Sequence, residues 1–205
     1  MGQLHQRYNS VMITSTETLL LNIIRHHLLD RQLPNNFNGE SGRACENLLE
    51  DKVGIRINRG AGCDIPAIGW EVKCRKGTAT SAQTVASMRP ENIISTPYKL
   101  SPIYNKIRKQ LRFTTNANDV IIAIDLCDFD QPQIQDLLQT AYDHARTLLK
   151  NNPELEYTPY EGYWGYFEKT KKNRPELDFR LADGQMEKLL DMTNSTFQEI
   201  FAYGN

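Results

Sequence analysis

The segment from Cys63 to Lys76 reads CDIPAIGWEVKCRK, and the interpretation of the whole chain starts from it. Its second half alternates large apolar side chains with charged ones, which is typical of a β-strand with one face in a core. This alternation places Glu71 and Lys73 on the same face of the strand, about 6.6 Å apart. A proline and a glycine precede the strand and favour a tight reversal of the chain. We therefore expect the reversal to bring Asp64 close to Glu71.

Two carboxylates and one ammonium on a rigid strand suit a hard cation such as Mg²⁺ together with a polarised water molecule. Asp64, Glu71 and Lys73 therefore indicate the centre of a Mg²⁺-dependent nuclease. Taken alone, however, these three residues favour a plainer interpretation, a solvated strand face that carries a salt bridge. The rest of the chain has to decide between these two interpretations.

Length and composition favour one domain over residues 1–205, because 205 residues are enough for a full hydrophobic core. No apolar run approaches the roughly 18 residues of a membrane span, and the N-terminus lacks the order of a signal peptide. We expect a soluble, cytoplasmic protein with no membrane partner. The four cysteines form no C-x-x-C pair and the four histidines have no metal-binding spacing, so neither a zinc site nor a redox pair is predicted.

The net charge of −1 hides a strongly basic segment. Residues 73–112 contain nine Lys or Arg residues and a single acidic residue, Glu91. A solvated charged face usually mixes both signs, whereas a polyanion-binding surface needs an excess of positive charge. This segment therefore predicts a nucleic-acid partner.

The order of predicted elements indicates an α/β fold with a mixed central β-sheet flanked by helices. Helices are expected from Thr14 towards Pro34, from Ser41 to Lys52 and over 103–111, 133–150 and 186–203. Short strands are expected at 55–57 and in a hairpin formed by 162–170 and 177–181. The apolar run over 119–126 is typical of a central strand buried on both faces.

The second helix carries two acidic residues four positions apart, Glu46 and Glu50, which share one face. Either carboxylate could reach over the strand and complete the shell of a metal ion. Either could also simply face solvent.

With these residues placed, the chain resembles the PD-(D/E)xK nuclease superfamily, and within it the MutH-like branch that also contains type II restriction endonucleases. The resemblance comprises Gly42-x-x-x-Glu46 on a helix, followed by Asp64-Ile-Pro-Ala-Ile-Gly-Trp-Glu71-Val-Lys73, and it covers residues 39–126 best. It implies a restriction-endonuclease-like core. Cys63 stands where the signature of the superfamily has a proline, a position that takes no part in the chemistry.

The same resemblance implies a role for each matched residue. Asp64, Glu71 and the Val72 carbonyl would hold Mg²⁺, and Lys73 would orient or deprotonate the attacking water. Glu46 would complete the acidic set, and Lys106 would lie near the scissile phosphate. Glu50 remains an alternative to Glu46.

A second, shorter resemblance concerns DNA recognition. Ser81-Ala-Gln83 and Asn92-Ile-Ile-Ser95 are similar to the DNA-reading segment of a blunt-cutting type II restriction endonuclease. Amide side chains read base edges, so Gln83 and Asn92 are the candidates for sequence recognition, although Asn92 could instead cap a turn near Pro90. Lysine and arginine bind phosphate without regard to sequence, and the candidates for that role follow: Arg75, Lys76, Lys106 and Lys109.

The sequence thus predicts a site-specific double-stranded DNA endonuclease of a restriction system, which hydrolyses phosphodiester bonds and leaves 5′-phosphate ends. Two alternatives stay open: a MutH-like repair enzyme that nicks one strand, and a non-catalytic DNA-binding protein with a decayed site. A homodimer is one arrangement that would place two such sites on a duplex.

Overall fold

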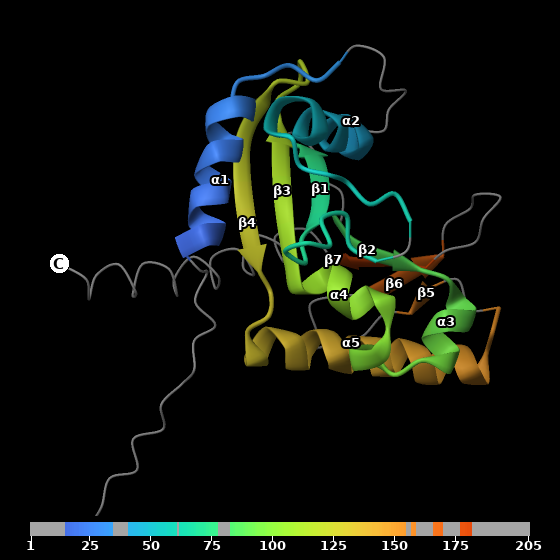
Figure 1. Ribbon diagram of the computed structural model, residues 1–205. Helices are drawn as coiled ribbons and strands as arrows, with labels where there is room; N and C mark the ends of the chain where they lie inside the picture. The colour runs from blue at the N-terminus through green and yellow to red at the C-terminus, as the bar shows by residue number, and fades with distance from the viewer. Residues whose placement is uncertain are drawn as a thin grey trace, which may run out of the picture.

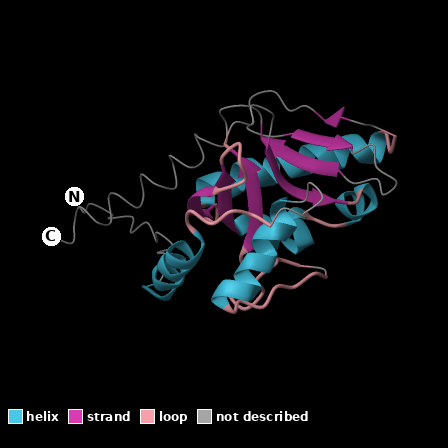
Figure 2. Ribbon diagram, turned by 90° about the horizontal axis from the view of Figure 1, so that it is seen from above, coloured by secondary structure: helices cyan, strands magenta, loops and turns pink. Residues whose placement is uncertain are grey.

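The computed structural model describes residues 15–34, 41–60, 62–77, 83–154, 157–158, 166–169 and 177–181. They form a mixed α/β structure with two small sheets, and helices lie on both sides of the strands (Figures 1 and 2). None of the described helices is both long enough and apolar enough to cross a membrane. The helix expected over 186–203 lies outside the described residues.

The first sheet is mixed and has the strand order β1-β3-β4. Strand β1 (Glu71–Lys76) runs parallel to β3 (Lys109–Thr115), and β3 runs antiparallel to β4 (Ile121–Asp128). Helix α1 (Ser15–Leu28) lies along β4, and α2 (Ser41–Leu48) packs on β1 (Figure 1). Helix α2 continues as a π-helical turn, Leu49–Val53, which ends at Gly54 in the left-handed conformation, so the predicted end of this helix is confirmed.

The second sheet is antiparallel and has the order β2-β7-β6-β5. Its strands are β2 (Gln83–Met88), β5 (Tyr157–Thr158), β6 (Tyr166–Lys169) and β7 (Leu177–Leu181). The predicted pairing of 162–170 with 177–181 is confirmed by β6 and β7. Three helical segments and one short turn accompany this sheet: α3 (Pro90–Ser95), a 3₁₀ turn (Tyr98–Leu100), α4 (Pro102–Arg108) and α5 (Pro132–Asn151).

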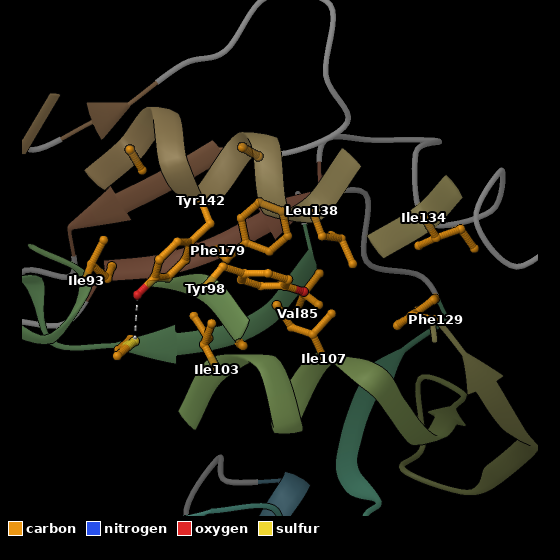
Figure 3. Packing of buried hydrophobic residues seen from close by; sticks show 14 of the residues in the cluster. Val85, Ile93, Tyr98, Ile103, Ile107, Phe129, Ile134, Leu138, Tyr142 and Phe179 are labelled. Carbon is orange, nitrogen blue, oxygen red and sulfur yellow. Dashed lines mark hydrogen bonds between the residues drawn. The ribbon is translucent and has the colours of Figure 1, made fainter. Parts of the chain in front are cut away.

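Each sheet has its own hydrophobic core. The core of the first contains Val72 of β1 and Trp70 directly before it, with Cys74 packed against them, so the predicted inward face is confirmed. The core of the second brings Val85 of β2 and Phe179 of β7 against the helices (Figure 3). Strand β3 and helix α4 join the two cores, because they follow one another directly in the chain.

The helix expected over 103–111 and the strand expected over 119–126 are present as α4 and β4, but the end of the first and the central position of the second are wrong, and the strand expected at 55–57 is absent. The helix expected over 103–111 ends at Arg108, and Lys109 begins β3, because pairing with strands on both sides outweighs the local helical pattern. Strand β3, not the apolar run at 119–126, is therefore the central strand. Strand β4 pairs only with β3 among the described strands, and Ile122 is 49% exposed. The segment 55–57 is a loop, since the Ile57 N–H donates to the Glu50 carboxylate instead of to a neighbouring strand.

Candidate active site

The reversal before β1 places Asp64 beside the first residues of the strand. Ile65 and Trp70 form an antiparallel bridge, with their backbone N–H groups donating to each other's carbonyl oxygens at 2.8 and 3.2 Å. Gly69 closes the turn at φ +72°, a conformation that glycine adopts without strain. One residue beyond the bridge, Asp64 Oδ2 accepts a hydrogen bond of 2.8 Å from the Val72 N–H. A short hairpin thus holds Asp64 next to Glu71 and Val72.

Glu71 is the buried centre of this arrangement, since only 2% of its surface is exposed. Its Oε1 atom accepts from Lys73 Nζ at 2.8 Å and lies 3.6 Å from Lys106 Nζ, which comes from helix α4. Among the described residues no donor reaches its other oxygen, Oε2, although that atom is buried. A buried carboxylate oxygen without a partner is costly, so this oxygen fits a ligand.

Glu46 approaches the same place from helix α2. Burial and the negative charge of Asp64 raise the pKa of Glu46, while Arg43 and Arg59 act in the opposite direction. Burial and the charge of Glu71 likewise raise the pKa of Asp64, against the Val72 N–H and the two lysines. Glu46, Asp64 and Glu71 thus form a local excess of negative charge, which a cation would relieve.

Glu50 has a different place. Its carboxylate accepts from the Ile57 N–H at 3.1 Å and pairs with the Arg59 guanidinium through both oxygens. It therefore ties the start of the π-helical turn to the loop that leads to Asp64. Of the two carboxylates between which the sequence could not decide, Glu46 faces the other acids and Glu50 clamps a loop.

The sequence analysis did not single out Arg43 or Arg59. Arg43 Nε lies 3.7 Å from Glu46 Oε2, and Arg59 binds both Glu50 and Asn47. The partners of Arg59 lie nine and twelve residues away across a loop whose path the sequence does not reveal. In the sequence, only the three-residue spacing of Arg43 and Glu46 indicates such a contact, because it places the two side chains on one face of the helix.

These residues fit an open Mg²⁺ site. In the described part of the chain, no three His, Cys, Asp or Glu side chains converge closely enough to form a metal cage of their own. Mg²⁺ does not need one, because it keeps several waters and usually takes one or two carboxylates together with phosphate oxygens. The unpartnered Glu71 Oε2 and the adjacent Asp64 supply such a pair. Within an extended strand the N–H and C=O of one residue point to the same side, so the Val72 carbonyl lies on the edge that Asp64 occupies.

The six residues expected to bind DNA do not form one group. Lys106 points at Glu71, whereas Lys109 is only 14% exposed and its ammonium binds Glu17 at 2.7 Å. At the far end of β1, Lys76 is exposed and pairs with Asp119 at 3.1 Å, next to the half-buried Arg75.

The two amide residues lie on the other sheet and its helices. Asn92 is exposed on helix α3, and Gln83 begins β2, with its side chain outside the described residues. The Asn92 N–H donates to the Arg89 carbonyl, and the Asn92 carbonyl accepts from the Thr96 N–H.

Neither models of known protein families nor curated proteins give a match to this chain.

Proposed function

We propose that this protein is a Mg²⁺-dependent endodeoxyribonuclease with a restriction-endonuclease-like core, which hydrolyses phosphodiester bonds in double-stranded DNA and leaves 5′-phosphate ends. The observation that carries the proposal is the convergence of Asp64, Glu71 and Lys73 on one hairpin, with the Glu71 Oε2 atom buried and without a donor among the described residues. The resemblance to PD-(D/E)xK nucleases rests on the same residues.

Asp64, Glu71 and the Val72 carbonyl would hold the metal ion. When bound, Mg²⁺ supplies Lewis-acid stabilisation of phosphate charge and a water of lowered pKa. Lys73, anchored on Glu71, is placed to orient the attacking water and take part in its deprotonation. Lys106 approaches from the other side and would neutralise charge that develops on the phosphate.

The basic segment supports DNA as the substrate. It begins at Lys73 and continues through β2, α3, α4 and β3, and two of its lysines, Lys73 and Lys106, lie at Glu71. Excess positive charge around a small acidic centre favours a polyanion that must approach a metal-binding site.

The deciding experiment incubates the purified protein with long genomic DNA and with supercoiled plasmid, in Mg²⁺ and in EDTA. Genomic DNA contains every short recognition sequence, so a site-specific enzyme should give discrete fragments whose sequenced ends carry 5′-phosphate. Asp64→Asn, which keeps the size of the side chain, should abolish cleavage while its melting temperature stays near that of the wild type. Absence of Mg²⁺-dependent cleavage by the folded wild type, or full activity of Asp64→Asn, would overturn the proposal.

The form of the plasmid product distinguishes two versions of this activity. Linear DNA would indicate cleavage of both strands, as expected of a restriction enzyme that acts as a homodimer. Open circles alone would indicate a nicking enzyme of the repair type.

A further inference from the structure

A glutamine lies in the interior of the first sheet, next to the acidic centre. Gln110 of β3 has no exposed surface and pairs in register with Glu71 of β1 on one side and Cys127 of β4 on the other. A buried amide is favourable only if its donors and its acceptor are satisfied.

Both the nitrogen and the oxygen of the Gln110 amide form hydrogen bonds, and their partners belong to three different elements. Its Nε2 group donates to the Val85 carbonyl of β2 at 2.7 Å and to the Lys106 carbonyl of α4 at 2.9 Å. Its Oε1 atom accepts from Arg112 Nη2 at 2.7 Å. One side chain thus connects the central strand of the first sheet, the first strand of the second sheet and the helix that carries Lys106.

The bond to Lys106 bears directly on the acidic centre. Helix α4 has only seven residues, and the Ser101 side chain caps its start by accepting from the Tyr104 N–H. Gln110 binds the last turn of α4 through the backbone carbonyl of Lys106. The ammonium group of the same residue lies 3.6 Å from Glu71 Oε1. A short helix contributes little rigidity of its own, so the position of Lys106 depends on this anchor.

We propose that Gln110 is a positioning residue that holds Lys106 against Glu71 and links the second sheet to the acidic centre. The position of Lys106 is a property of the folded protein alone, whereas its consequence for cleavage rests on the proposed nuclease function. Replacing the amide by an apolar side chain of similar length removes both donors, and the last turn of α4 is then free to shift.

Gln135 provides a matched control. It is also buried, donates to the Phe129 carbonyl at 2.8 Å and accepts from the Tyr98 hydroxyl at 2.9 Å, but it lies in α5 and bonds no residue of the acidic centre. Gln110→Met and Gln135→Met both remove a satisfied buried amide. Only the first should affect Lys106.

The first measurement needs neither metal nor DNA. Lysine amines are labelled in the folded protein with a trace of acetic anhydride and quantified by mass spectrometry, with exposed Lys99 as internal reference. The ion pair with Glu71 suppresses the reactivity of Lys106, so Gln110→Met should raise it several-fold relative to the wild type, and Gln135→Met should leave it unchanged. If Gln110→Met does not fold, Gln110→Glu, which keeps the length and the acceptor for Arg112, takes its place. Unchanged labelling of Lys106, or an equal rise in the control, overturns the proposal.

The second measurement is a double-mutant cycle on single-turnover cleavage. Gln110→Met should lower the rate by about 10- to 10²-fold at unchanged DNA affinity, because displaced catalytic groups cost rate more than binding. In a Lys106→Ala background the same substitution should have almost no effect, since the residue through which it acts is gone. Additive effects of the two substitutions would contradict the positioning role. If the wild type does not cleave DNA at all, the nuclease proposal fails, and the labelling result still decides the role of Gln110.

Discussion

At the scale of single residues, Glu71 is the most constrained group of the candidate site. It is buried, and one of its carboxylate oxygens accepts a hydrogen bond from Lys73 Nζ. Its other oxygen has no donor among the described residues. Lys73 binds one oxygen of this buried carboxylate and at the same time stands where a water or phosphate would approach the proposed site. The ion pair of Glu71 and Lys73 therefore stabilises the folded site and also holds Lys73 where the proposed reaction needs it.

Lys73→Ala should lower the rate of Mg²⁺-dependent cleavage by about 10²–10³-fold, since that is the usual cost of removing one electrostatic stabiliser. DNA affinity should change little, because phosphate binding is expected to be shared among several cations. Lys76→Ala, at the exposed end of the same strand, is the control and should cleave normally at saturating protein. A Lys73→Ala enzyme within tenfold of the wild type would remove Lys73 from the mechanism.

Glu46 and Glu50 should respond differently to the same change. Glu46→Gln should reduce cleavage while the melting temperature is kept or raised, because burial and Asp64 already disfavour the charge of Glu46. Glu50→Gln should lower the melting temperature, because it weakens the clamp on Ile57 and Arg59. Cleavage assays and thermal melts on both variants check this. The reverse ranking in cleavage would give the catalytic role to Glu50.

At the scale of elements, an ion-pair network attaches helix α1 to the first sheet. Lys109 Nζ at the start of β3 binds Glu17 of α1 at 2.7 Å and lies 3.8 Å from Asp128 of β4, and Trp70 Nε1 donates to the same Glu17 oxygen at 3.3 Å. These groups are all largely buried. The network therefore holds α1, β3 and β4 together behind the strand that carries Glu71.

Lys109 thus has a structural place, and we expect its replacement to leave the salt dependence of DNA binding unchanged. Removing one partner of a buried ion pair leaves charges without compensation, so Lys109→Met should lower the free energy of unfolding by about 3 kcal/mol. Lys99→Ala, on the exposed 3₁₀ turn, should have no such effect. Urea unfolding and salt titrations of DNA binding check both. A fully stable Lys109→Met with a reduced salt slope would restore the phosphate-binding role.

Asp128 should make stability depend on pH. Burial raises the pKa of Asp128, helped by Asp130 and Glu17 and opposed by the Asp130 N–H and by Lys109. The folded state therefore takes up this proton at a higher pH than the unfolded state, and its charge opposes folding near neutral pH. As the pH falls from 7 towards the ordinary value of 3.8, this group should add to the free energy of unfolding. Asp128→Asn should flatten that part of the profile, measured by urea unfolding. An unchanged profile would show that another group is responsible.

At the scale of the whole molecule, the two sheets would carry different parts of the proposed function, catalysis and DNA recognition. The first sheet and α2 carry the acidic group, while β2 and α3 of the second carry Gln83 and Asn92, the expected readers of base edges. Gln110 lies where the two meet. A nuclease that must cut only at its own sequence needs such a connection between recognition and chemistry.

Asn92→Ala should therefore reduce the preference for the cognate sequence by about 1–3 kcal/mol and leave the salt slope unchanged, because an amide reads bases and carries no charge. Lys76→Ala should do the opposite and lower the slope of log affinity against log salt by about 1. Binding titrations at several salt concentrations, on cognate and scrambled duplexes, separate the two. Full discrimination by Asn92→Ala would show that Asn92 does not read bases.

The sequence by itself determined the features that depend on neighbours along the chain. The alternation in β1, the turn at Gly69 and the helical spacing of Glu46 act within a few residues, so the hairpin with Asp64 and Glu71 could be predicted. Helix α5 followed from its apolar periodicity for the same reason. Local sterics and periodicity are sufficient where the partners are close in sequence.

Only the tertiary structure decided what depends on distant partners. Lys109 was expected on a helix facing DNA, but its partner Glu17 lies 92 residues away, and pairing with β1 and β4 made its segment the central strand. Glu50 stayed open as an alternative to Glu46, and its pairing with Arg59 and the loop distinguishes the two. The bonds of Gln110 to two other elements have no sequence signature at all. Packing of the whole chain sets these contacts, because burial and long-range pairing outweigh local propensity when the two disagree.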